Sequence, residues 1–314
     1  MTAPARVRLL FLLVFLAYLL VLPQTLLVAR PQDGSAGTTV SIFLSARDTN
    51  GNPITDLKAD EVRVLENGTA LRIAAFKNAA EGQLTVGLLL DSSGSRRFQF
   101  PGAERDGAAQ FLEELARLRA NAFIESFDEY VYLHADATSD MAELHSGLQR
   151  ALAKTQQSSS SLYTAILDTS RRKLAPQAGR KILVLTSDGV DNSSPQVDRE
   201  LKRVTKKLLQ DGTILYAILL ASPDDKTRPA AAREGQKNIK MIAEQSGGEA
   251  FVADSVEQVT AAFQRIAAFI AAEYRVEFVP RKLPWSGELR RLRVETTRKN
   301  VVVSAPGGFF APEE

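Results

Sequence analysis

Cysteine is absent from the 314 residues of this chain, which also holds only two histidines and one tryptophan. The lack of cysteine excludes disulfides, zinc–thiolate sites, iron–sulfur clusters and thiol nucleophiles. Two histidines are too few for a metal site built on several imidazoles. The chemistry left to the side chains therefore depends on oxygen, from carboxylates and hydroxyls.

An excess of charge of either sign is also missing. Lys and Arg number 39 and Asp and Glu number 37, so the net charge is only +2. Such a balance creates no strong field that would attract nucleic acid, and no nucleic-acid partner is expected. Hydrophobic residues make up 45% of the chain, which is enough for a sizeable core. The length predicts about two domains.

Residues 1–29 have the pattern of an export signal. Arg6 and Arg8 precede an apolar run at residues 9–22, which is the charged-then-apolar order of a secretory signal. With the apolar residues up to Ala29 included, the run reaches ~20 residues, enough to cross a bilayer. We therefore expect an extracytoplasmic protein that is secreted, periplasmic or anchored in the membrane and facing outward. Cleavage of the segment and its retention as a membrane anchor both stay open.

The middle zone of the chain, residues 82–272, alternates strand and helix signals. Continuous apolar runs lie at 84–90, 181–186 and 213–221, and such runs are typical of strands covered by helices on both faces. This order predicts an α/β fold with a doubly wound, mostly parallel sheet of Rossmann-like architecture. Helical spacing is found at residues 108–118, 141–152, 162–174, 197–209, 239–245 and 255–270.

The flanking zones, residues 30–81 and 273–314, are rich in strand and turn signals. Turn-forming residues at 48–53 and 66–68 separate stretches of partly alternating character, as in hairpins. Each flank alone holds about three strands, too few for a comfortable two-layer core. We therefore expect the two flanks to pair into one small β-sandwich module.

Oxygen-bearing side chains follow the predicted strands of the middle zone. Asp91, Ser93 and Ser95 come after the first apolar run, and Asp188 comes after the second. Ser160 lies between them, at the start of a predicted helix. In an open parallel sheet, ligands bind beyond the carboxyl ends of the strands. Two carboxylates and three hydroxyls form a hard-oxygen set, which favours Mg²⁺ over zinc or copper.

In this order the residues resemble the metal-ion-dependent adhesion site (MIDAS) of von Willebrand factor A (VWA) domains. The resemblance covers about residues 82–272, and the flanks are similar to those of bacterial secreted "VWFA-related" proteins. It implies the VWA fold and a bound Mg²⁺, with Mn²⁺ or Ca²⁺ as substitutes. It also implies that Ser93 and Ser95 coordinate the metal directly. Asp91 and Asp188 would then hold it mainly through water.

Two features depart from the family pattern. Ser160 stands where the family usually has threonine after two glycines, and Ser158 and Ser159 stand in place of those glycines. Arg96 and Arg97 come directly after the first motif, where an apolar residue is usual. Two cations near a divalent metal weaken its binding unless they help to recruit an acidic ligand.

Residues beside the predicted metal ligands are assigned to ligand binding: Arg96, Arg97, Ser159 and Asp191. For Asp191 a plain solvated turn is the alternative. Asp128 and Asp140 also lie near the predicted edge of the sheet. We expect both to be exposed loop carboxylates, and the alternative is that they contact the metal ligands.

The leading hypothesis is Mg²⁺-dependent protein binding or adhesion without catalysis. An acidic side chain of a partner protein would complete the coordination of the metal. One alternative is a structural scaffold with a degenerate metal site, in which Asp91 and Asp188 cap helices and Ser160 is an N-cap. A Mg²⁺-dependent hydrolase or phosphatase is the least favoured reading, because a credible histidine base is missing.

Overall fold

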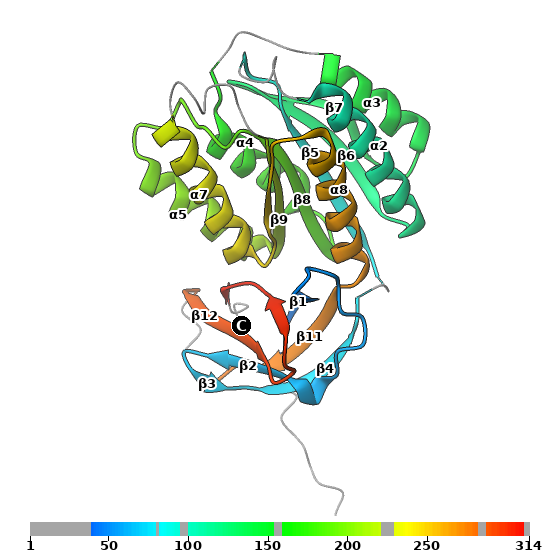
Figure 1. Ribbon diagram of the computed structural model, residues 1–314. Helices are drawn as coiled ribbons and strands as arrows, with labels where there is room; N and C mark the ends of the chain where they lie inside the picture. Colours follow the sequence, from blue (N-terminus) through cyan, green and yellow to red (C-terminus); the bar gives the residue numbers. More distant parts are fainter. Residues whose placement is uncertain are drawn as a thin grey trace, which may run out of the picture. The chain divides into compact units, whose positions relative to one another are not determined.

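A six-stranded sheet runs through the α/β part of the chain (Figure 1). The computed structural model describes residues 39–79, 82–94, 100–153, 159–220, 229–281 and 287–310. In sheet order the strands are β10 (Ala250–Ala253), β9 (Thr213–Leu220), β8 (Arg180–Ser187), β5 (Leu84–Asp91), β6 (Asn121–Phe127) and β7 (Val131–Thr138). All neighbouring strands are parallel except β6 and β7. The predicted doubly wound, mostly parallel sheet is therefore confirmed.

The order of the strands reverses in the middle of this sheet. From β5 the chain adds β6 and β7 on one side, and it then returns to add β8, β9 and β10 on the other. The reversal lies between β5 and β8. Open α/β sheets bind ligands at such a switch point, outside the carboxyl ends of the strands.

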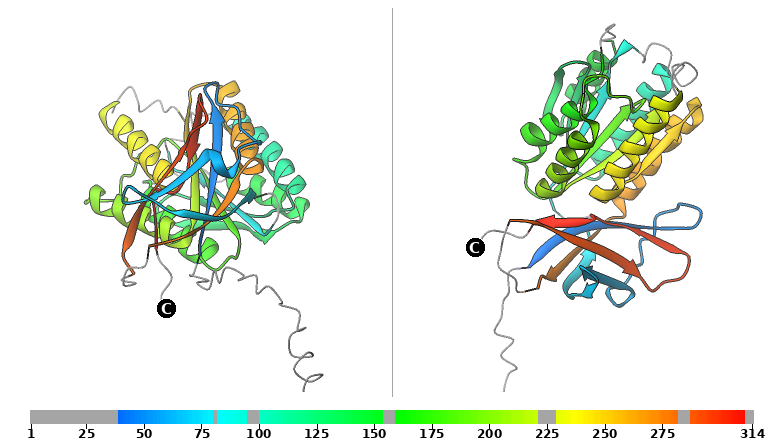
Figure 2. Two further views of the ribbon diagram at one scale, coloured as in Figure 1. Left: turned by 90° about the horizontal axis from the view of Figure 1, so that it is seen from below. Right: turned by 90° about the vertical axis from the view of Figure 1, so that its left-hand side faces the viewer.

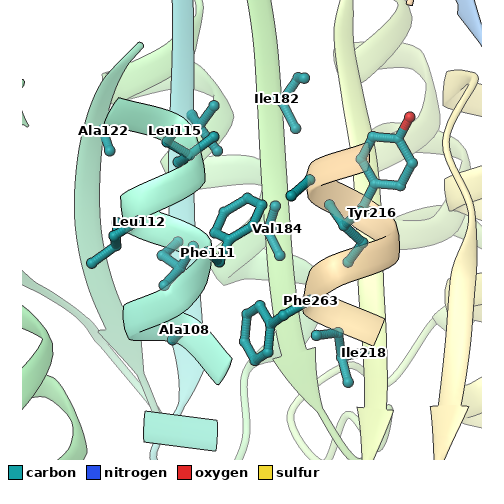
Figure 3. Close-up of a cluster of buried hydrophobic side chains, with 14 of the residues drawn as sticks. Ala108, Phe111, Leu112, Leu115, Ala122, Ile182, Val184, Tyr216, Ile218 and Phe263 are labelled. Atoms are coloured by element: carbon teal, nitrogen blue, oxygen red, sulfur yellow. The ribbon is translucent and has the colours of Figure 1, made fainter. Parts of the chain in front are cut away.

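Helices cover both faces of the sheet. One face carries α2 (Pro101–Arg117), α3 (Met141–Ala153) and α8 (Val256–Ala271), and the other carries α4 (Leu162–Thr169), α5 (Val197–Asp211) and α7 (Pro229–Ser246). Every residue of β5 and β9 is buried, as their continuous apolar runs predict. Figure 3 shows part of the first face, where Phe111 and Phe263 lie beside Val184 with their ring centroids 5.9 Å apart.

The strands outside this sheet form a β-sandwich built from both ends of the described chain (Figure 2). The N-terminal flank supplies β1 (Val40–Asp48), β2 (Val62–Glu66), β3 (Thr69–Ala70) and β4 (Arg72–Asn78), and the C-terminal flank supplies β11 (Tyr274–Val279), β12 (Leu289–Thr296), β13 (Val301–Ser304) and β14 (Gly308–Phe310). The two sheets have the orders β13-β1-β11-β4 and β14-β12-β2-β3. Strands of one flank thus pair with strands of the other, which confirms the predicted module.

The strand pairings do not show where one predicted zone ends and the next begins. The residues Thr38–Glu314 form one compact unit, and the boundaries at residues 82 and 272 stay predictions. The predicted export segment, residues 1–29, lies outside the described residues. In the described ranges no helix is long and apolar enough to cross a membrane.

A buried ion pair links β8 to the connection between α8 and β11. Arg180 and Glu273 are 3% and 1% exposed, and Arg180 Nη1 lies 3.1 Å from Glu273 Oε2. The same nitrogen donates to the carbonyl of Ile270 at 2.8 Å. The Tyr216 hydroxyl of β9 donates to Glu273 Oε1 at 3.4 Å. Removal of one partner from an ion pair buried to this degree strongly lowers the free energy of unfolding, because the other charge is left buried without a partner.

The surroundings of Glu273 change its ionisation. Burial raises the pKa of Glu273 from 4.5 to about 7, although the Arg180 guanidinium opposes this shift. Burial also raises the pKa of Tyr216 well above its usual value, and the nearby Glu273 adds to the effect. Between pH 4.5 and about 7 the folded protein therefore holds a proton on Glu273 that the unfolded chain has lost.

This difference predicts a pH-dependent stability. The contribution of Glu273 is fully present below pH 4.5 and is lost as the pH rises to about 7, a decrease of roughly 3 kcal/mol at most in the free energy of unfolding. In Glu273→Gln the decrease should be reduced, as measured by urea unfolding at several pH values across this range. The control Glu257→Gln, at an exposed position of α8, should keep the original slope. An unchanged slope in Glu273→Gln would contradict the account.

Candidate metal centre

Three neighbouring strands end in polar residues at one edge of the sheet. Asp91 is the last residue of β5, Asp128 follows β6, and Ser187 ends β8 directly before Asp188. The strands are parallel, with Asp91 opposite Phe127 and Leu90 opposite Thr186. Their carboxyl ends therefore meet at the switch point between β5 and β8.

Asp91 binds the turns that follow both β5 and β8. Its side chain lies in a residue that is 2% exposed. Oδ1 accepts a hydrogen bond from the Ser93 backbone N–H at 2.9 Å, and Oδ2 accepts one from the Ser187 hydroxyl at 2.7 Å. Ser187 Oγ in turn accepts from the Gly189 N–H at 3.0 Å. These contacts fix the position of Ser93 and of the turn that carries Asp188.

Asp188 is also buried, at 2% exposed, and lies in a tight turn. Its Oδ1 accepts from the Val190 N–H at 2.9 Å. The next residue, Gly189, has φ +84°, and a Cβ there would lie 3.1 Å from the backbone nitrogen of Gln236 in α7. Only glycine combines this left-handed backbone with such a close approach. The turn that carries Asp188 is therefore fixed by these hydrogen bonds and by its close packing against α7.

Ser160 places a hydroxyl without a partner next to this turn. The residue is 2% exposed, and its carbonyl accepts from the Asn192 N–H at 2.9 Å. Among the residues that the structure describes, none is a hydrogen-bond partner of its Oγ. The N-cap of α4 is Ser161, with no side-chain cap bond, so the reading of Ser160 as an N-cap is wrong. A buried hydroxyl without a partner costs free energy, and the role of Ser160 as a metal ligand stays a prediction.

The predicted ligand-binding residues have different surroundings. Asp191 holds the loop against α4, because its Oδ2 accepts from the Tyr163 N–H and its Oδ1 from the N–H groups of Ser193 and Ser194, each at 2.9 Å. Ser159 is exposed. The roles of both stay predictions. The remaining predicted site residues, Ser95, Arg96 and Arg97, lie outside the described residues.

Asp128 is the residue that the sequence misjudged. It is 1% exposed, so the expectation of an exposed loop carboxylate is wrong, whereas Asp140 is exposed and accepts from the Ala142 N–H at the start of α3. The Asp128 carbonyl accepts from the Ser161 N–H at 2.9 Å, which brings it beside the Ser160 segment. Its Oδ1 accepts from the Tyr130 N–H at 3.0 Å, and its Oδ2 has no hydrogen-bond partner within the described ranges.

Two further buried residues at this edge were not recognised. Glu104, in the first turn of α2, is 0% exposed and accepts a hydrogen bond from Thr186 Oγ1. Ser187 binds Asp91 as described above. The available signal was position: Thr186 and Ser187 are the last residues of an apolar strand that ends at the switch point.

The donor set fits a hard divalent cation. Buried hydroxyl and carboxylate oxygens gather here, and Ser160 Oγ lacks a protein partner. In the described ranges no group of three or more Asp, Glu, His or Cys side chains is arranged to hold a metal. A cation at this edge would therefore depend on serine hydroxyls and water as well as carboxylates, as Mg²⁺ sites do when they keep several waters.

No protein-family model matches the sequence, and no curated protein matches it. Among solved structures, a mutant of the PilB minor pilin from Streptococcus sanguinis is 11% identical with a TM-score of 0.51, over 61% of this chain and 62% of that one. The pilus adhesin SpaC from Lactobacillus rhamnosus GG is 12% identical with a TM-score of 0.50, over 90% of this chain and 43% of that one. The vWF domain of the pili tip protein Mfa5 from Porphyromonas gingivalis is 13% identical with a TM-score of 0.47, over 60% of this chain and 95% of that one.

These likenesses concern the fold. The α/β part therefore shares its fold with these neighbours, and the VWA resemblance stays an expectation from the sequence.

The contacts of Ser187 predict a cost for its removal. Ser187→Ala should lower the free energy of unfolding by about 1–3 kcal/mol, because Asp91 and the Gly189 N–H would lose a buried partner. Urea unfolding of both proteins measures the difference. The control Ser193→Ala, at an exposed hydroxyl, should change stability by less than about 0.5 kcal/mol. Equal effects of the two substitutions would contradict the role given to Ser187.

Proposed function

We propose that this chain is an exported binding protein that holds Mg²⁺ at the carboxyl edge of its sheet and recognises an acidic side chain of a partner protein. The observation that carries the proposal is the buried Ser160 hydroxyl without a partner, next to the turn that presents Asp188. Export rests on the charged and apolar pattern of residues 1–29.

The residues that would hold the cation are the predicted set. Ser93, Ser95 and Ser160 would supply hydroxyl oxygens, and Asp91 and Asp188 would act mainly through bound water. Mn²⁺ and Ca²⁺ accept the same class of oxygen ligands. When bound, the cation supplies a concentrated positive charge to which a carboxylate of the partner attaches. Arg96 and Arg97 would support that carboxylate if they lie beside it.

The histidine contacts support binding rather than catalysis. His134 bonds with the Ser126 hydroxyl at 2.7 Å, and exposed His145 lies 3.2 Å from Glu113. Each histidine thus has a partner outside the site, which disfavours a histidine base for a serine nucleophile there. Adhesion also agrees with the two structural neighbours above, a minor pilin and a pilus adhesin.

A scaffold with a degenerate metal site is the second candidate. It is favoured by one observation: both carboxylate oxygens of Asp91 already accept hydrogen bonds from the protein, from Ser93 and Ser187. In this reading Asp91 only stabilises the two turns. A cation titration separates the two candidates.

The unpartnered hydroxyl gives the sharpest test. In metal-free protein Ser160→Ala should leave stability unchanged or slightly raised, because no hydrogen bond is lost. The same change should weaken Mg²⁺ binding about tenfold or more in calorimetry, since one buried ligand is removed. Ser193→Ala is the matched control and should bind Mg²⁺ like the unchanged protein.

Stability should follow binding in the unchanged protein. Mg²⁺ at ~100 times its dissociation constant should raise the free energy of unfolding by ~2.7 kcal/mol. The absence of both heat and stabilisation with Mg²⁺ and Mn²⁺ would favour the scaffold. Mg²⁺ binding that is equal in Ser160→Ala and in the unchanged protein would contradict the assigned site.

Recognition of an acidic group has its own test. A short peptide with one Asp should bind in the presence of Mg²⁺, and the same peptide with Asn in its place should not, because only the carboxylate can attach to the cation. Titrations followed by NMR measure both. A chelator should abolish the binding, and so should Asp188→Ala. Binding that survives the chelator would contradict a metal-centred mechanism.

A further inference from the structure

A cavity lies at the edge of the sheet opposite the proposed cation site. Its volume is about 470 Å³, within the range of small-molecule pockets. Its walls come from β1, from the first residues of β8 and β9, from the end of α5 and from β14. Because β8 and β9 are parallel, their first residues lie at the amino edge and the residues near Asp91 lie at the carboxyl edge.

Lys181 and Thr213 bring polar groups to this cavity. They are opposite each other on β8 and β9, and both line the cavity. Side chains alternate along a strand, so these two share a face with Leu183 and Leu215, which belong to the core beneath α5. Lys181 and Thr213 therefore lie at the end of the core beneath α5, where it borders the cavity.

Thr213 has an unsatisfied hydroxyl. The residue is 1% exposed, and its Oγ1 has no hydrogen-bond partner in the described part of the chain. Buried hydroxyls are normally paired. A ligand in the cavity would supply the missing partner.

Lys181 is a partly buried cation that lines the cavity. Of the carboxylates that the structure describes, none lies within salt-bridge distance of its ammonium group. The nearby Asp211 is held instead by Lys207 at 2.8 Å and by the Ser170 hydroxyl at 2.9 Å. Burial lowers the pKa of Lys181, and Asp211 partly opposes this shift. A half-buried cation of this kind favours an anion that enters the cavity.

The second cation of the cavity is partly engaged. Arg275 Nε donates to the Ser41 hydroxyl at 2.9 Å, and its Nη2 lies 3.0 Å from Glu277. Apolar residues also line the cavity, among them Phe43, Leu208 and Phe310. The cavity thus offers a cation and a hydroxyl at one place and apolar walls elsewhere.

We propose that this cavity binds a small organic carboxylate with an apolar tail, its carboxylate at Lys181 and Thr213 and its tail against the apolar walls. The Thr213 hydroxyl has no hydrogen-bond partner among the described residues, and Lys181 lies opposite it on the neighbouring strand, so that a hydroxyl donor and a cation match one carboxylate. The site needs no metal and lies at the other edge of the sheet, so it is independent of the proposed function.

Octanoate is the probe for calorimetry and NMR titration of the protein from residue 38 onward in the presence of a chelator. Octanoate should bind, and both octanol and acetate should bind at least tenfold more weakly, because each lacks one of the two recognised features. Lys181→Met should weaken octanoate binding tenfold or more, and Lys181→Arg should retain most of it. The control Lys202→Met, on the exposed surface of α5, should have no effect.

Folding of the variants is checked alongside. Thr213→Val removes a hydroxyl that has no partner, so its unfolding midpoint should equal or exceed that of the unchanged protein, while its octanoate affinity falls. Absence of octanoate binding would overturn the proposal. Equal binding of octanol, or unchanged affinity in Lys181→Met and Thr213→Val, would also overturn it.

Discussion

The parallel alignment of β5 and β8 is the constraint on which the rest of the site depends. It brings Asp91 and Ser187 together, and their hydrogen bond of 2.7 Å joins two turns that are far apart in the sequence. The turn after β5 then presents Ser93, and the turn after β8 presents Asp188. With a different strand order, the same residues would be ordinary loop residues without a common location.

The β-sandwich contacts the α/β part at the amino ends of the parallel strands, opposite the edge that carries Asp91. Arg180, the first residue of β8, binds Glu273 at the start of the return into β11. The next residue, Lys181, faces the cavity that also contacts β1 and β14. The sheet therefore has a polar carboxyl edge suited to a cation and an amino edge with a half-apolar cavity. The two sites are separated by the buried length of the strands.

The parts of the structure that the sequence predicts are those with a local signal. Continuous apolar runs identify β5, β8 and β9, and the residues directly after them, Asp91 and Asp188, lie where expected. Asp128 was misjudged because its neighbours look like an exposed turn, whereas its burial results from the distant Ser161 segment. The first half of α7 and the short β14 lack apolar periodicity. Their formation depends on packing and pairing with segments that are remote in sequence.

The central claim is that oxygen atoms at this edge hold a divalent cation, and its location can be measured directly. Crystals of the protein grown with Mn²⁺ would give anomalous scattering from the bound metal. We predict one peak within coordination distance of the Ser160 hydroxyl, at the edge formed by Asp91 and Asp188. Well-ordered crystals with no manganese at that edge, or with manganese held only elsewhere, would contradict the account.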